Sequence, residues 1–582
     1  MNKFKRVLVA NRGGEIAIRV FRACHELGIR TVAIYSEEDK FSLFRTKADE
    51  AYLIGKNKGP IDAYLNIEEI IQLALKKGGV DAIHPGYGFL AENSEFARKC
   101  REAGIEFIGP TAEMMEKLGD KIKSKIVAEK AGGVPTIPGV QKPIKSEKEA
   151  LEFARYCVYP IMLKAAAGGG GRGMRIVRTE EELISSFKSA KNEAKKAFGI
   201  DDIFIEKYLE NPKHIEVQIL GDKHGNMVHL YERDCSIQRR HQKVIEFTPA
   251  FALPKKKRKE ICNDALKIAK TVGYRSAGTL EFLVDTTGNH YFIEMNPRIQ
   301  VEHTVTEMIT GIDIVQSQIL IAEGYKLDSE EVGIKSQESI QTRGYAIQCR
   351  VTTEDPSNNF APDTGKIEDY RTGSGFGIRL DGGNGFTGSV ISPYYDSLLV
   401  KTTSWSRTFN DAIRKSIRAI KEFKIDGVKT NIGFLINVLN HEQFRKGQCD
   451  TNFIEKNPEL FDITSKTDDE ARILKFIGEK VVNETHGIKK DFDVPTIPIV
   501  DEGGLSLKGT KQILDEKGPE GGLVSWIKNQ NKLLLTDTTM RDAHQSLMAT
   551  RMRSVDMFKI AKAQSVLGKD LFSMEMWGGS NL

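Results

Sequence analysis

The stretch "TLEFLVDTTGNHYFIEMN", residues 279–296, consists of two strand-like apolar runs on either side of a turn sequence. Gly288 and Asn289 are typical of the turns of β-hairpins, and the flanking runs are rich in residues that favour strands. The stretch therefore predicts an antiparallel hairpin. Each run carries one glutamate, Glu281 in the first and Glu294 in the second.

The register of this hairpin decides where its two glutamates point. A turn of two or four residues, centred on the Thr-Gly pair, places Asp285 opposite His290. Counting outward from that pair then places Glu281 directly opposite Glu294. Because side chains alternate between the faces of a strand, both glutamates lie on one face, which Asn296 shares. The opposite face is apolar and consists of Leu280, Phe282, Val284, Tyr291, Ile293 and Met295.

Two directly opposed carboxylates on neighbouring strands have Cβ atoms about 5 Å apart and repel each other. A divalent cation held by oxygen ligands reverses the sign of that interaction, and Mg²⁺ suits carboxylates that share it with substrate phosphates. A solvated pair that splays apart, or one protonated glutamate, agrees equally well with the hairpin. The hairpin alone leaves both interpretations open.

The composition is that of a globular protein with several domains. Of the 582 residues, 40% are hydrophobic and 28% are charged, and a net charge of +5 is too small to indicate a nucleic-acid or membrane partner. The basic run at residues 254–260 continues at helical spacing, so we interpret it as the start of a solvated helix. No apolar run has transmembrane length, and the N-terminal sequence lacks the pattern of a signal or transit peptide. The seven cysteines include no C-x-x-C pair, and we expect a cytoplasmic protein.

Patterns along the chain divide it into five predicted regions. The first alternates strands and helices, as in a Rossmann-like α/β domain, although its "NRGGEIA" stretch lacks the G-x-G-x-x-G spacing of dinucleotide sites. The second contains a glycine-rich loop and the hairpin, and the third contains short antiparallel strands with helices. The fourth is a charged connector, and the fifth begins a new strand and helix. Their predicted bounds are residues 1–120, 121–334, 335–455, 456–530 and 531–582.

A glycine-rich stretch, "YPIMLKAAAGGGGRGMRIV" at residues 159–177, connects two predicted strands. Its first strand carries Lys164, and four glycines follow it, Gly168, Gly169, Gly170 and Gly171. Glycine lets backbone N–H groups close over an anion, and a lysine adds positive charge beside phosphates. The stretch is not a Walker loop, because no G-K-[ST] precedes a helix. We interpret it as a flap over nucleotide phosphates, with a flexible linker as the alternative.

Two further polar stretches follow this loop. Glu206 lies among strand-like residues, where it fits either an adenine contact or a surface ion pair with Lys207. The stretch "ERDCSIQRRHQKVIE", residues 232–246, is either a solvated loop or a binding site for small anions. Within it, Cys235 is interpreted as a small packing residue, because no neighbouring feature marks it as a thiolate.

The residues after the hairpin, "NPRIQVEHTVTE", place Arg298, Gln300 and Glu302 at alternate positions. If this segment is extended, all three side chains point the same way. A positively charged clamp beside a carboxylate is what an enzyme needs to hold bicarbonate and remove its proton.

Together these stretches make residues 1–455 resemble biotin carboxylase, a family of ATP-grasp enzymes. The motifs that carry the resemblance are "GGEIAIR", "HPGYGFLAEN", "GGGGRGMR", "EKYLENPKHIE", "ERDCSIQRRHQK" and "EMNPRIQVEHTVTE". No single motif is specific, but the combination is. The resemblance implies an α/β (α+β ATP-grasp) fold, with a Rossmann-like N-terminal domain, an ATP-grasp domain and a biotin carboxylase C-terminal domain.

The resemblance also implies roles for individual residues. The implied ATP contacts are Lys121, Lys164, Glu206, His214, Gln238 and His241, with the four glycines as the flap. The implied metal ligands are Glu281, Glu294 and Asn296, which agrees with the face predicted for the hairpin. The implied bicarbonate contacts are Lys243, Arg298, Gln300 and the backbone of Val301. Glu302 would be the general base, and Arg350 would stabilise the biotin enolate.

The implied activity is the ATP-dependent carboxylation of biotin with bicarbonate, through carboxyphosphate and with Mg²⁺ or Mn²⁺. Biotin would be supplied in trans, free or on a carrier domain, because the chain contains no Met-Lys-Met attachment sequence. By the same resemblance we expect a homo-oligomer, with dimeric carboxylase domains and a tetramer in the complete enzyme.

The last predicted region resembles the pyruvate carboxylase family, whose carboxyltransferase barrel begins with a stretch similar to "LLLTDTTMRDAHQSLMATRMR". The resemblance implies a second metal ligand at Asp542 and pyruvate contacts at Arg541 and Gln545, at the end of a first barrel strand. Capping of the following helix is the alternative role for this group. Only one of the eight βα units is present, so we do not expect this chain alone to make oxaloacetate.

Two other functions remain open from the sequence. One is the carboxylase subunit of an acyl-CoA carboxylase, against which the barrel-like stretch argues. The other is a nucleotide-binding remnant without turnover, against which the complete set of catalytic residues argues.

Overall fold

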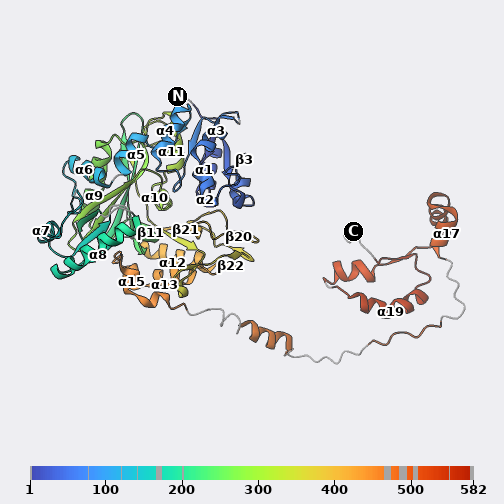
Figure 1. Cartoon of the computed structure of the whole chain (residues 1–582). Helices are drawn as coiled ribbons and strands as arrows, with labels where there is room; N and C mark the ends of the chain where they lie inside the picture. Colours follow the sequence, from blue (N-terminus) through green and yellow to red (C-terminus); the bar gives the residue numbers. More distant parts are fainter. Residues whose placement is uncertain are drawn as a thin grey trace. The chain divides into compact units, whose positions relative to one another are not determined.

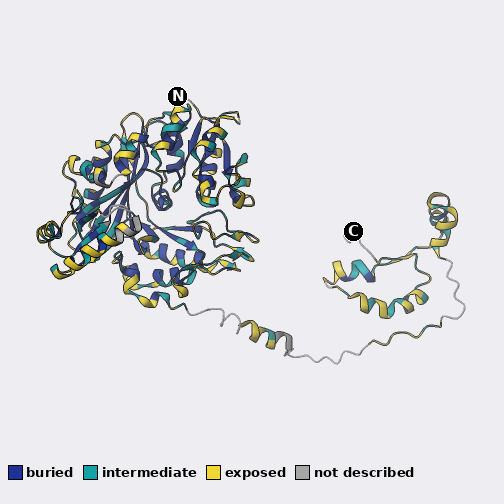
Figure 2. Cartoon of the chain, in the orientation of Figure 1, coloured by how far each residue is buried: buried dark blue, intermediate teal, exposed yellow. Residues whose placement is uncertain are grey.

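A computed structural model of the chain describes residues 3–76, 78–119, 121–140, 142–165, 174–198, 202–463, 473–483, 495–501, 509–549 and 551–576. The chain separates into two units, residues 1–464 and 465–582. Figure 1 shows the elements of both units. Buried residues gather along the strands of the first unit, whereas exposed residues lie on the outer faces of its helices (Figure 2).

The N-terminal region is built on β1 (Arg6–Val9), β2 (Arg30–Tyr35), β3 (Glu50–Leu53), β4 (Ala82–His84) and β5 (Glu106–Phe107). They form a parallel sheet in the order β3-β2-β1-β4-β5. Along β1, Val7 and Val9 enter one apolar cluster, whereas Leu8 enters another. A parallel sheet with two buried faces needs helices on both sides, and this confirms the predicted Rossmann-like arrangement. The helices are α1 (Gly14–Glu26), α2 (Pro60–Tyr64), α3 (Ile67–Lys76), α4 (Ser94–Glu102) and α5 (Ala112–Gly119).

A small antiparallel sheet follows, made of β6 (Ile161–Ala165), β7 (Met174–Val177) and β8 (Ile203–Lys207). Its strand order is β7-β6-β8. The helices α7 (Glu147–Cys157) and α8 (Glu180–Phe198) pack on it over one apolar cluster. The predicted glycine flap lies between β6 and β7, outside the described residues.

The first unit also contains a larger sheet of β9 (Lys213–Gly221), β10 (Met227–Arg239), β11 (Gln242–Thr248), β12 (Ser276–Val284), β13 (His290–Asn296), β14 (Tyr345–Thr352), β19 (Ile378–Gly382) and β21 (Leu398–Ser406). Its order is β13-β12-β9-β10-β11-β14-β21-β19. Strands β9 to β13 precede the predicted boundary at residue 334, and the other three follow it. The antiparallel pairing of β11 with β14 therefore joins two predicted regions into one sheet.

Helices cover this larger sheet. The helices α6 (Lys121–Lys130) and α9 (Lys255–Thr271) share an apolar cluster with β9, β12 and β13. The start of α9 directly after Pro254 confirms the interpretation of the basic run as a helix start. On the β14–β21 side lie α12 (Phe409–Lys421) and α13 (Ile432–Asn440). The other elements of this unit are α10 (His303–Thr310), α11 (Ile314–Glu323), α14 (Glu442–Arg445), α15 (Phe453–Lys456) and the short strands β15 (Glu354–Asp355), β16 (Ala361–Pro362), β17 (Gly365–Lys366), β18 (Asp369–Arg371), β20 (Val390–Ile391) and β22 (Lys424–Asp426).

The turn of the β12–β13 hairpin differs from the predicted one. The N–H of Asp285 donates to the carbonyl of Asn289 at 2.9 Å, which leaves an odd number of residues in the loop. Val284 consequently pairs with His290. The predicted pairing of Asp285 with His290 is therefore wrong, because the sequence did not distinguish a turn with an odd number of residues from one with an even number.

A β-bulge at Ile293 restores the predicted register farther from the turn, and Glu281 pairs with Glu294. The prediction of two opposed glutamates is thus confirmed. Phe292 enters the apolar core, whereas Tyr291 and Ile293 are only partly buried. Their predicted place on the apolar face is wrong, because the odd loop shifts β13 by one residue until the bulge. The other predicted members of that face are buried: Leu280, Phe282, Val284 and Met295.

The second unit contains a short parallel strand pair, β23 (Thr536–Asp537) with β24 (Ser573–Met574). The helix α19 (Ser554–Leu567) lies between the two strands in sequence, and α17 (Thr510–Lys517) and α18 (Ser525–Lys528) precede them. A strand, a helix and a parallel strand form the βαβ connection of parallel sheets, in agreement with the predicted start of a strand and helix.

The apolar helices of the first unit are short. No single helix among the described residues is both long and apolar enough to cross a membrane. The pair α10 and α11 reaches that length and composition only when its two helices, bent by 91° at their junction, are counted together.

Candidate functional site

A cleft of about 960 Å³ opens over the larger sheet of the first unit. It is lined by residues from β6, β8, β9, β11, β12, β13 and β14 and from the segment between β13 and α10. Fourteen predicted site residues that the structure describes line this one cleft: Lys164, Glu206, His214, Gln238, His241, Lys243, Glu281, Glu294, Asn296, Arg298, Gln300, Val301, Glu302 and Arg350. The glycines Gly168, Gly169, Gly170 and Gly171 and the side chain of Lys121 lie outside the described residues.

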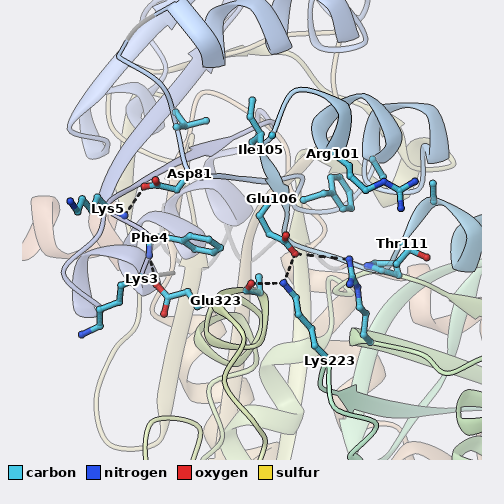
Figure 3. A pocket seen from close by; sticks show the side chains of 18 residues that line it. Lys3, Phe4, Lys5, Asp81, Arg101, Ile105, Glu106, Thr111, Lys223 and Glu323 are labelled. Carbon is cyan, nitrogen blue, oxygen red and sulfur yellow. Dashed lines mark hydrogen bonds and ion pairs between the residues drawn. The ribbon is translucent and has the colours of Figure 1, made fainter. Parts of the chain in front are cut away.

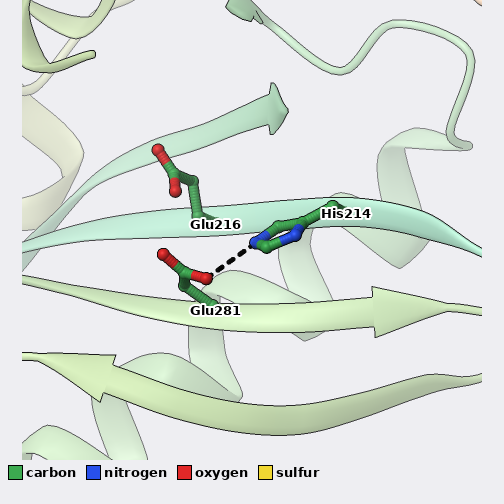
Figure 4. A group of neighbouring side chains, drawn as sticks. All are labelled: His214, Glu216 and Glu281. Atoms are coloured by element: carbon green, nitrogen blue, oxygen red, sulfur yellow. Dashed lines mark ion pairs between the residues drawn. The ribbon is translucent and has the colours of Figure 1, made fainter. Parts of the chain in front are cut away.

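Three glutamates form a row across three neighbouring strands on the cleft side of the sheet. Glu294 on β13 pairs with Glu281 on β12, and Glu281 pairs with Glu216 on β9. We call these three residues the acidic row. His214 lies on the same face of β9, and its Nε2 is 2.8 Å from Glu281 Oε2 (Figure 4). Carboxylate oxygens grouped in this way are the ligands that Mg²⁺ prefers, so the residues present fit a divalent metal.

Lys243 on β11 reaches into the acidic row. Its Nζ lies 2.5 Å from Glu216 Oε2, 3.0 Å from Glu281 Oε1 and 2.7 Å from Glu302 Oε1. Burial alone would lower the pKa of Lys243, but these carboxylates raise it well above its ordinary value. Burial alone would raise the pKa of Glu281, but Lys243 and His214 outweigh burial and lower it. Lys243 and Glu281 therefore hold each other in their charged forms.

Glu302 lies between two cations. One carboxylate oxygen is 2.7 Å from Lys243 Nζ, and the other accepts from Arg350 Nη2 at 3.1 Å. Only 1% of the residue is exposed. Burial alone would raise the pKa of Glu302, but Lys243, Arg350 and Arg233 lower it well below its ordinary value. The carboxylate is therefore ionised and able to accept a proton.

Arg350 on β14 connects Glu302 with a second buried carboxylate. Its Nε donates to Glu246 Oε1 at 2.6 Å, and Gln348 Nε2 donates to the other oxygen of Glu246 at 2.9 Å. Burial, together with the nearby Glu302, raises the pKa of Glu246 despite Arg350. The guanidinium thus faces one readily ionised carboxylate and one that holds its proton more strongly.

Arg298, Gln300 and Glu302 all line the cleft, although the segment is not a strand. β13 ends at Asn296, a turn includes Val301 and Glu302, and α10 begins directly afterwards. Arg298 Nη1 lies 3.4 Å from Gln300 Oε1. The predicted common direction is therefore confirmed, but the side chains converge through a turn and not by alternation along a strand.

The cleft is also lined by Lys164 and Glu206, the predicted ATP contacts from β6 and β8. Glu206 forms ion pairs with Lys164 and with Lys125 of α6. Burial alone would raise the pKa of Glu206, but these lysines outweigh burial and lower it. Lys207 donates instead to the carbonyl of Val158 at 2.7 Å, so the alternative of an ion pair with Glu206 is wrong.

Three family models match the first unit. They are "Biotin carboxylase, N-terminal domain" over residues 3–115, "Carbamoyl-phosphate synthase L chain, ATP binding domain" over residues 120–330 and "Biotin carboxylase C-terminal domain" over residues 348–456. A solved structure matches as well, the biotin carboxylase domain dimer of Hydrogenobacter thermophilus 2-oxoglutarate carboxylase, in complex with MgADP, ADP and bicarbonate. It is 53% identical with a TM-score of 0.74, and the match covers 79% of this chain and 99% of that one. The chain belongs to the biotin carboxylase family.

Longer relatives of this chain are pyruvate carboxylases. That of Bacillus subtilis is 58% identical over 99% of this chain and 50% of its own length. The structure of Rhizobium etli pyruvate carboxylase with the allosteric activator acetyl coenzyme A is 49% identical with a TM-score of 0.75 and covers 99% of this chain and 52% of that one. The chain thus spans about half the length of the curated relatives it matches.

Three charged residues of this site were not predicted from the sequence. Glu216, Glu246 and Lys125 each contact a predicted residue across strands or between elements distant in sequence. For Glu216 a signal was present, because His214 and Glu216 alternate along a predicted strand and so share one face. No comparable pattern marks Glu246 or Lys125.

The stretch at residues 232–246 is not a solvated loop. Most of it belongs to β10 and β11, and only its central turn around Arg240 and His241 is exposed. Cys235 is fully buried, and burial together with Glu216 raises its pKa well above the ordinary value. Its interpretation as a packing residue is confirmed. Gln238 Nε2 lies 2.8 Å from His214 Nδ1, which brings two predicted ATP contacts together.

In the second unit the predicted group around Arg541 follows β23. Arg541 lies 2.8 Å from Asp542 and also forms an ion pair with Glu575, while Gln545 is exposed. Asp537 Oδ1 accepts from the N–H of Thr539 at 2.9 Å, whereas Thr538, the N-cap residue of the following helix, makes no side-chain cap hydrogen bond. The roles of Asp542, Arg541 and Gln545 in metal and pyruvate binding stay predictions.

A second cavity, of about 1000 Å³, lies between the N-terminal region and the ATP-grasp region. Lys223 spans part of it, with Nζ 2.7 Å from Glu106 Oε1 and 2.6 Å from the carbonyl of Ala322 (Figure 3). None of the predicted site residues that the structure describes lines this cavity. The chemistry predicted from the sequence is therefore concentrated in the other cleft.

Proposed function

We propose that this chain catalyses the ATP-dependent carboxylation of biotin with bicarbonate, the first half-reaction of a pyruvate carboxylase. The observation that carries the proposal is that one cleft is lined both by Lys164 and Glu206 and by Lys243, Glu302 and Arg350. Solved relatives are described with MgADP and bicarbonate bound. The enzyme is in this view a carboxylating ligase.

For the nucleotide, the proposal assigns phosphate binding to Lys164 and base or ribose contacts to Glu206, His214, Gln238 and His241. The Lys164–Glu206 pair holds the lysine side chain at the cleft. An incoming phosphate competes with Glu206 for that lysine, so the pair keeps the ammonium in place until the anion arrives.

For the metal, the proposal assigns Glu281, Glu294 and Asn296 as ligands of Mg²⁺ or Mn²⁺. When bound, such an ion neutralises charge on the β- and γ-phosphates. Glu281 is 6% exposed and already ionised beside Lys243. Asn296 Nδ2 donates to Glu281 Oε1 at 2.8 Å and thereby fixes the carboxylate plane.

For bicarbonate, the proposal assigns anion binding to Lys243, Arg298, Gln300 and the backbone of Val301, and proton removal to Glu302. Two of the three cations that lower the pKa of Glu302, Lys243 and Arg350, also line the cleft. A bound anion interacts with the same cations and thereby reduces their stabilisation of the ionised Glu302 carboxylate. The pKa of the carboxylate then rises, which makes it a better proton acceptor only when substrate is present.

For biotin, the proposal assigns stabilisation of the enolate oxygen to Arg350. Its guanidinium is fixed from behind by Glu246 and presents its remaining N–H groups to the cleft. A preorganised cation beside developing negative charge stabilises the transition state without reorganisation.

The proposal extends to the assembly and location of the protein. A homo-oligomer with dimeric carboxylase domains is supported by the description of the Hydrogenobacter relative as a dimer. A cytoplasmic location agrees with the bacterial relatives, whereas the Homo sapiens relative is named mitochondrial. An acyl-CoA carboxylase subunit is the weaker candidate, because the similarity to pyruvate carboxylase includes residues beyond 530.

ADP release in the presence of bicarbonate, with and without free biotin, tests the proposal. We expect bicarbonate-dependent release that biotin stimulates. In Glu302→Gln the bicarbonate-dependent rate should fall by about 10²–10⁴, the usual contribution of a positioned base, while ATP affinity stays within about twofold of the parent. Lost ATP binding in that variant would argue against the role of Glu302, and a parent chain that binds ATP without turnover would argue for an inert remnant.

A further inference from the structure

The backbone between β13 and α10 is held from behind by two buried side chains. His303 Nδ1 lies 2.8 Å from the carbonyl of Gln300, and Lys401 Nζ donates to the carbonyl of Val301 at 3.1 Å. Both side chains belong to fully buried residues, His303 at the start of α10 and Lys401 on β21. Two consecutive peptide carbonyls are thus fixed by donors from two different elements.

These two contacts determine which way the peptide N–H groups point. The carbonyl and the N–H of a planar trans peptide point in opposite directions. A hydrogen bond from His303 to the Gln300 carbonyl therefore directs the N–H of Val301 away from His303. Gln300, Val301 and Glu302 line the cleft, whereas His303 and Lys401 do not.

The ring of His303 is suited to this contact. Burial, together with the cations Lys401 and Arg379, lowers the pKa of His303 well below its ordinary value. A neutral imidazole carries one proton, and only an Nδ1–H can donate to a carbonyl oxygen at that position. The contact to Gln300 thus fixes the tautomer of the ring.

Lys401 is an unexpected residue at its place in the sheet. It pairs directly with Arg350 on one side and with Asp381 on the other. A buried cation opposite another cation costs stability, and an apolar side chain of similar size would avoid that cost. Asp381 offsets part of it, although Arg379 already binds that carboxylate at 2.7 and 3.0 Å.

We propose that His303 and Lys401 are positioning residues that present the Val301 N–H and the Glu302 carboxylate to the bicarbonate ion. This inference rests on the proposed function of the cleft and deepens it. Neither side chain touches substrate in this scheme; each acts through the peptide that it holds. Loss of either contact lets the turn at Val301 and Glu302 move. The groups that bind the anion are then no longer held in position, while the residues that bind the nucleotide are unaffected.

Lys401→Met tests the lysine, because methionine fills a similar volume without a donor or charge. We expect the bicarbonate concentration for half-maximal ADP release to rise about tenfold, the effect of one lost hydrogen bond to a site for a charged ligand. The corresponding ATP concentration should change by less than about twofold. Asp381 keeps Arg379 as a partner in this variant, which favours folding.

Lys213→Met is the matched control. Lys213 also lies on the larger sheet and also donates to backbone carbonyls, those of Gly447 at 2.7 Å and Cys449 at 2.8 Å, but it holds a different part of the chain. We expect a similar loss of thermal stability and no change in the bicarbonate requirement. If both variants raise that requirement equally, the effect is merely structural and the inference is wrong.

A pair of variants at His303 gives a second test should Lys401→Met fail to fold. His303→Asn keeps a donor near the position of Nδ1, whereas His303→Leu removes it. We expect the bicarbonate requirement to rise in the leucine variant and to remain near the parent value in the asparagine variant. An equal requirement in both would overturn the role of His303.

The outcomes also separate this inference from the proposed function. If the parent chain shows no bicarbonate-dependent ADP release, the proposed function fails. If the parent shows that activity while Lys401→Met and His303→Leu fold and leave its bicarbonate requirement unchanged, only the positioning role fails.

Discussion

Two groups of like-charged side chains lie opposite each other across strands of the same sheet, and they are neutralised in different ways. In the acidic row, Glu281 pairs with Glu294 and with Glu216, and one lysine, Lys243, is shared among Glu216, Glu281 and Glu302. In the basic pair, Arg350 faces Lys401.

Each cation of the basic pair lies beside at least one carboxylate. Arg350 contacts two carboxylates, Glu246 and Glu302, and Lys401 lies opposite Asp381. Directly opposed like charges are destabilising, so each pair needs a partner of the other sign. In the acidic row three carboxylates lie beside two cations, Lys243, which Glu302 shares, and Arg233, which binds Glu216, and the row therefore retains capacity for an added cation. The basic pair, beside which Arg379 adds a further cation at Asp381, does not. The difference explains why the metal is expected beside the acidic row.

Lys243→Met is expected to have the largest effect, because it removes the cation that the acids share. Truncating one partner of a buried ionic group costs about 3–5 kcal/mol, so the chain should unfold at much lower denaturant and lose activity. Urea denaturation of Lys243→Met and of Lys243→Met with Glu281→Gln measures the charge contribution. The double variant should be the more stable of the two; if it is not, repulsion among the carboxylates is not the cause. Lys213→Met is again the control.

Glu281→Gln should act mainly on the metal requirement. The amide keeps the shape of the side chain but removes one negative charge from the row, and we expect the Mg²⁺ concentration for half-maximal ADP release to rise at least about tenfold. A titration of activity with Mg²⁺ at saturating ATP measures the shift. An unchanged Mg²⁺ requirement would mean that the metal lies elsewhere.

Stability should fall in acid because of the ionised carboxylates of the site. The pKa values of Glu281, Glu302 and Glu206 are lower in the folded chain than their ordinary values. The unfolded chain therefore binds more protons as the pH falls. The stabilisation is complete above the unfolded glutamate pKa of about 4.3 and is lost as the pH falls through the folded values. Urea midpoints measured from pH 7 to 3 should decline more gently in Glu302→Gln than in the parent.

Glu246→Gln should have the smallest effect. The pKa of Glu246 is raised and not lowered, because burial and Glu302 outweigh Arg350. An amide keeps an oxygen for Arg350 but loses the acceptor for Gln348 Nε2, so the unfolding free energy should fall by about 1–3 kcal/mol, less than for Lys243→Met. Chemical denaturation and ADP release, compared with Glu302→Gln, check this order. A larger effect at Glu246 than at Glu302 would contradict the distinction between the two carboxylates.

The sequence sufficed for residues whose position follows from alternation along one strand. Glu281 and Glu294 were placed opposite each other by counting from a turn. The structure departs from that prediction twice, and the two departures cancel: the loop has an odd number of residues, and a bulge lies at Ile293. Counting could not find the bulge, because a bulge is fixed by packing on both faces of the sheet. The misplaced Tyr291 and Ile293 are the visible result.

Contacts between distant strands were beyond such counting. Glu216 on β9 contacts Lys243 on β11, Glu246 on β11 contacts Arg350 on β14, and Lys125 on α6 contacts Glu206 on β8. The fold alone brings these elements together. The resemblance to biotin carboxylase supplied most of the site residues, and the cleft brings together those that the structure describes. The alternative interpretation of Glu206, an ion pair with Lys207, failed because neighbouring residues of a strand point to opposite faces.

The pairing of β11 with β14 has a consequence for the exchange of parts between enzymes. The seam between the second and third predicted regions consists of strand hydrogen bonds together with the Arg350–Glu246 contact, and it lies within the cleft side of one sheet. A chimera that replaced residues 335–455 with those of a distant carboxylase would have to reproduce both. The region is therefore not an interchangeable module, and its recombination is constrained by the residues it contributes to the cleft.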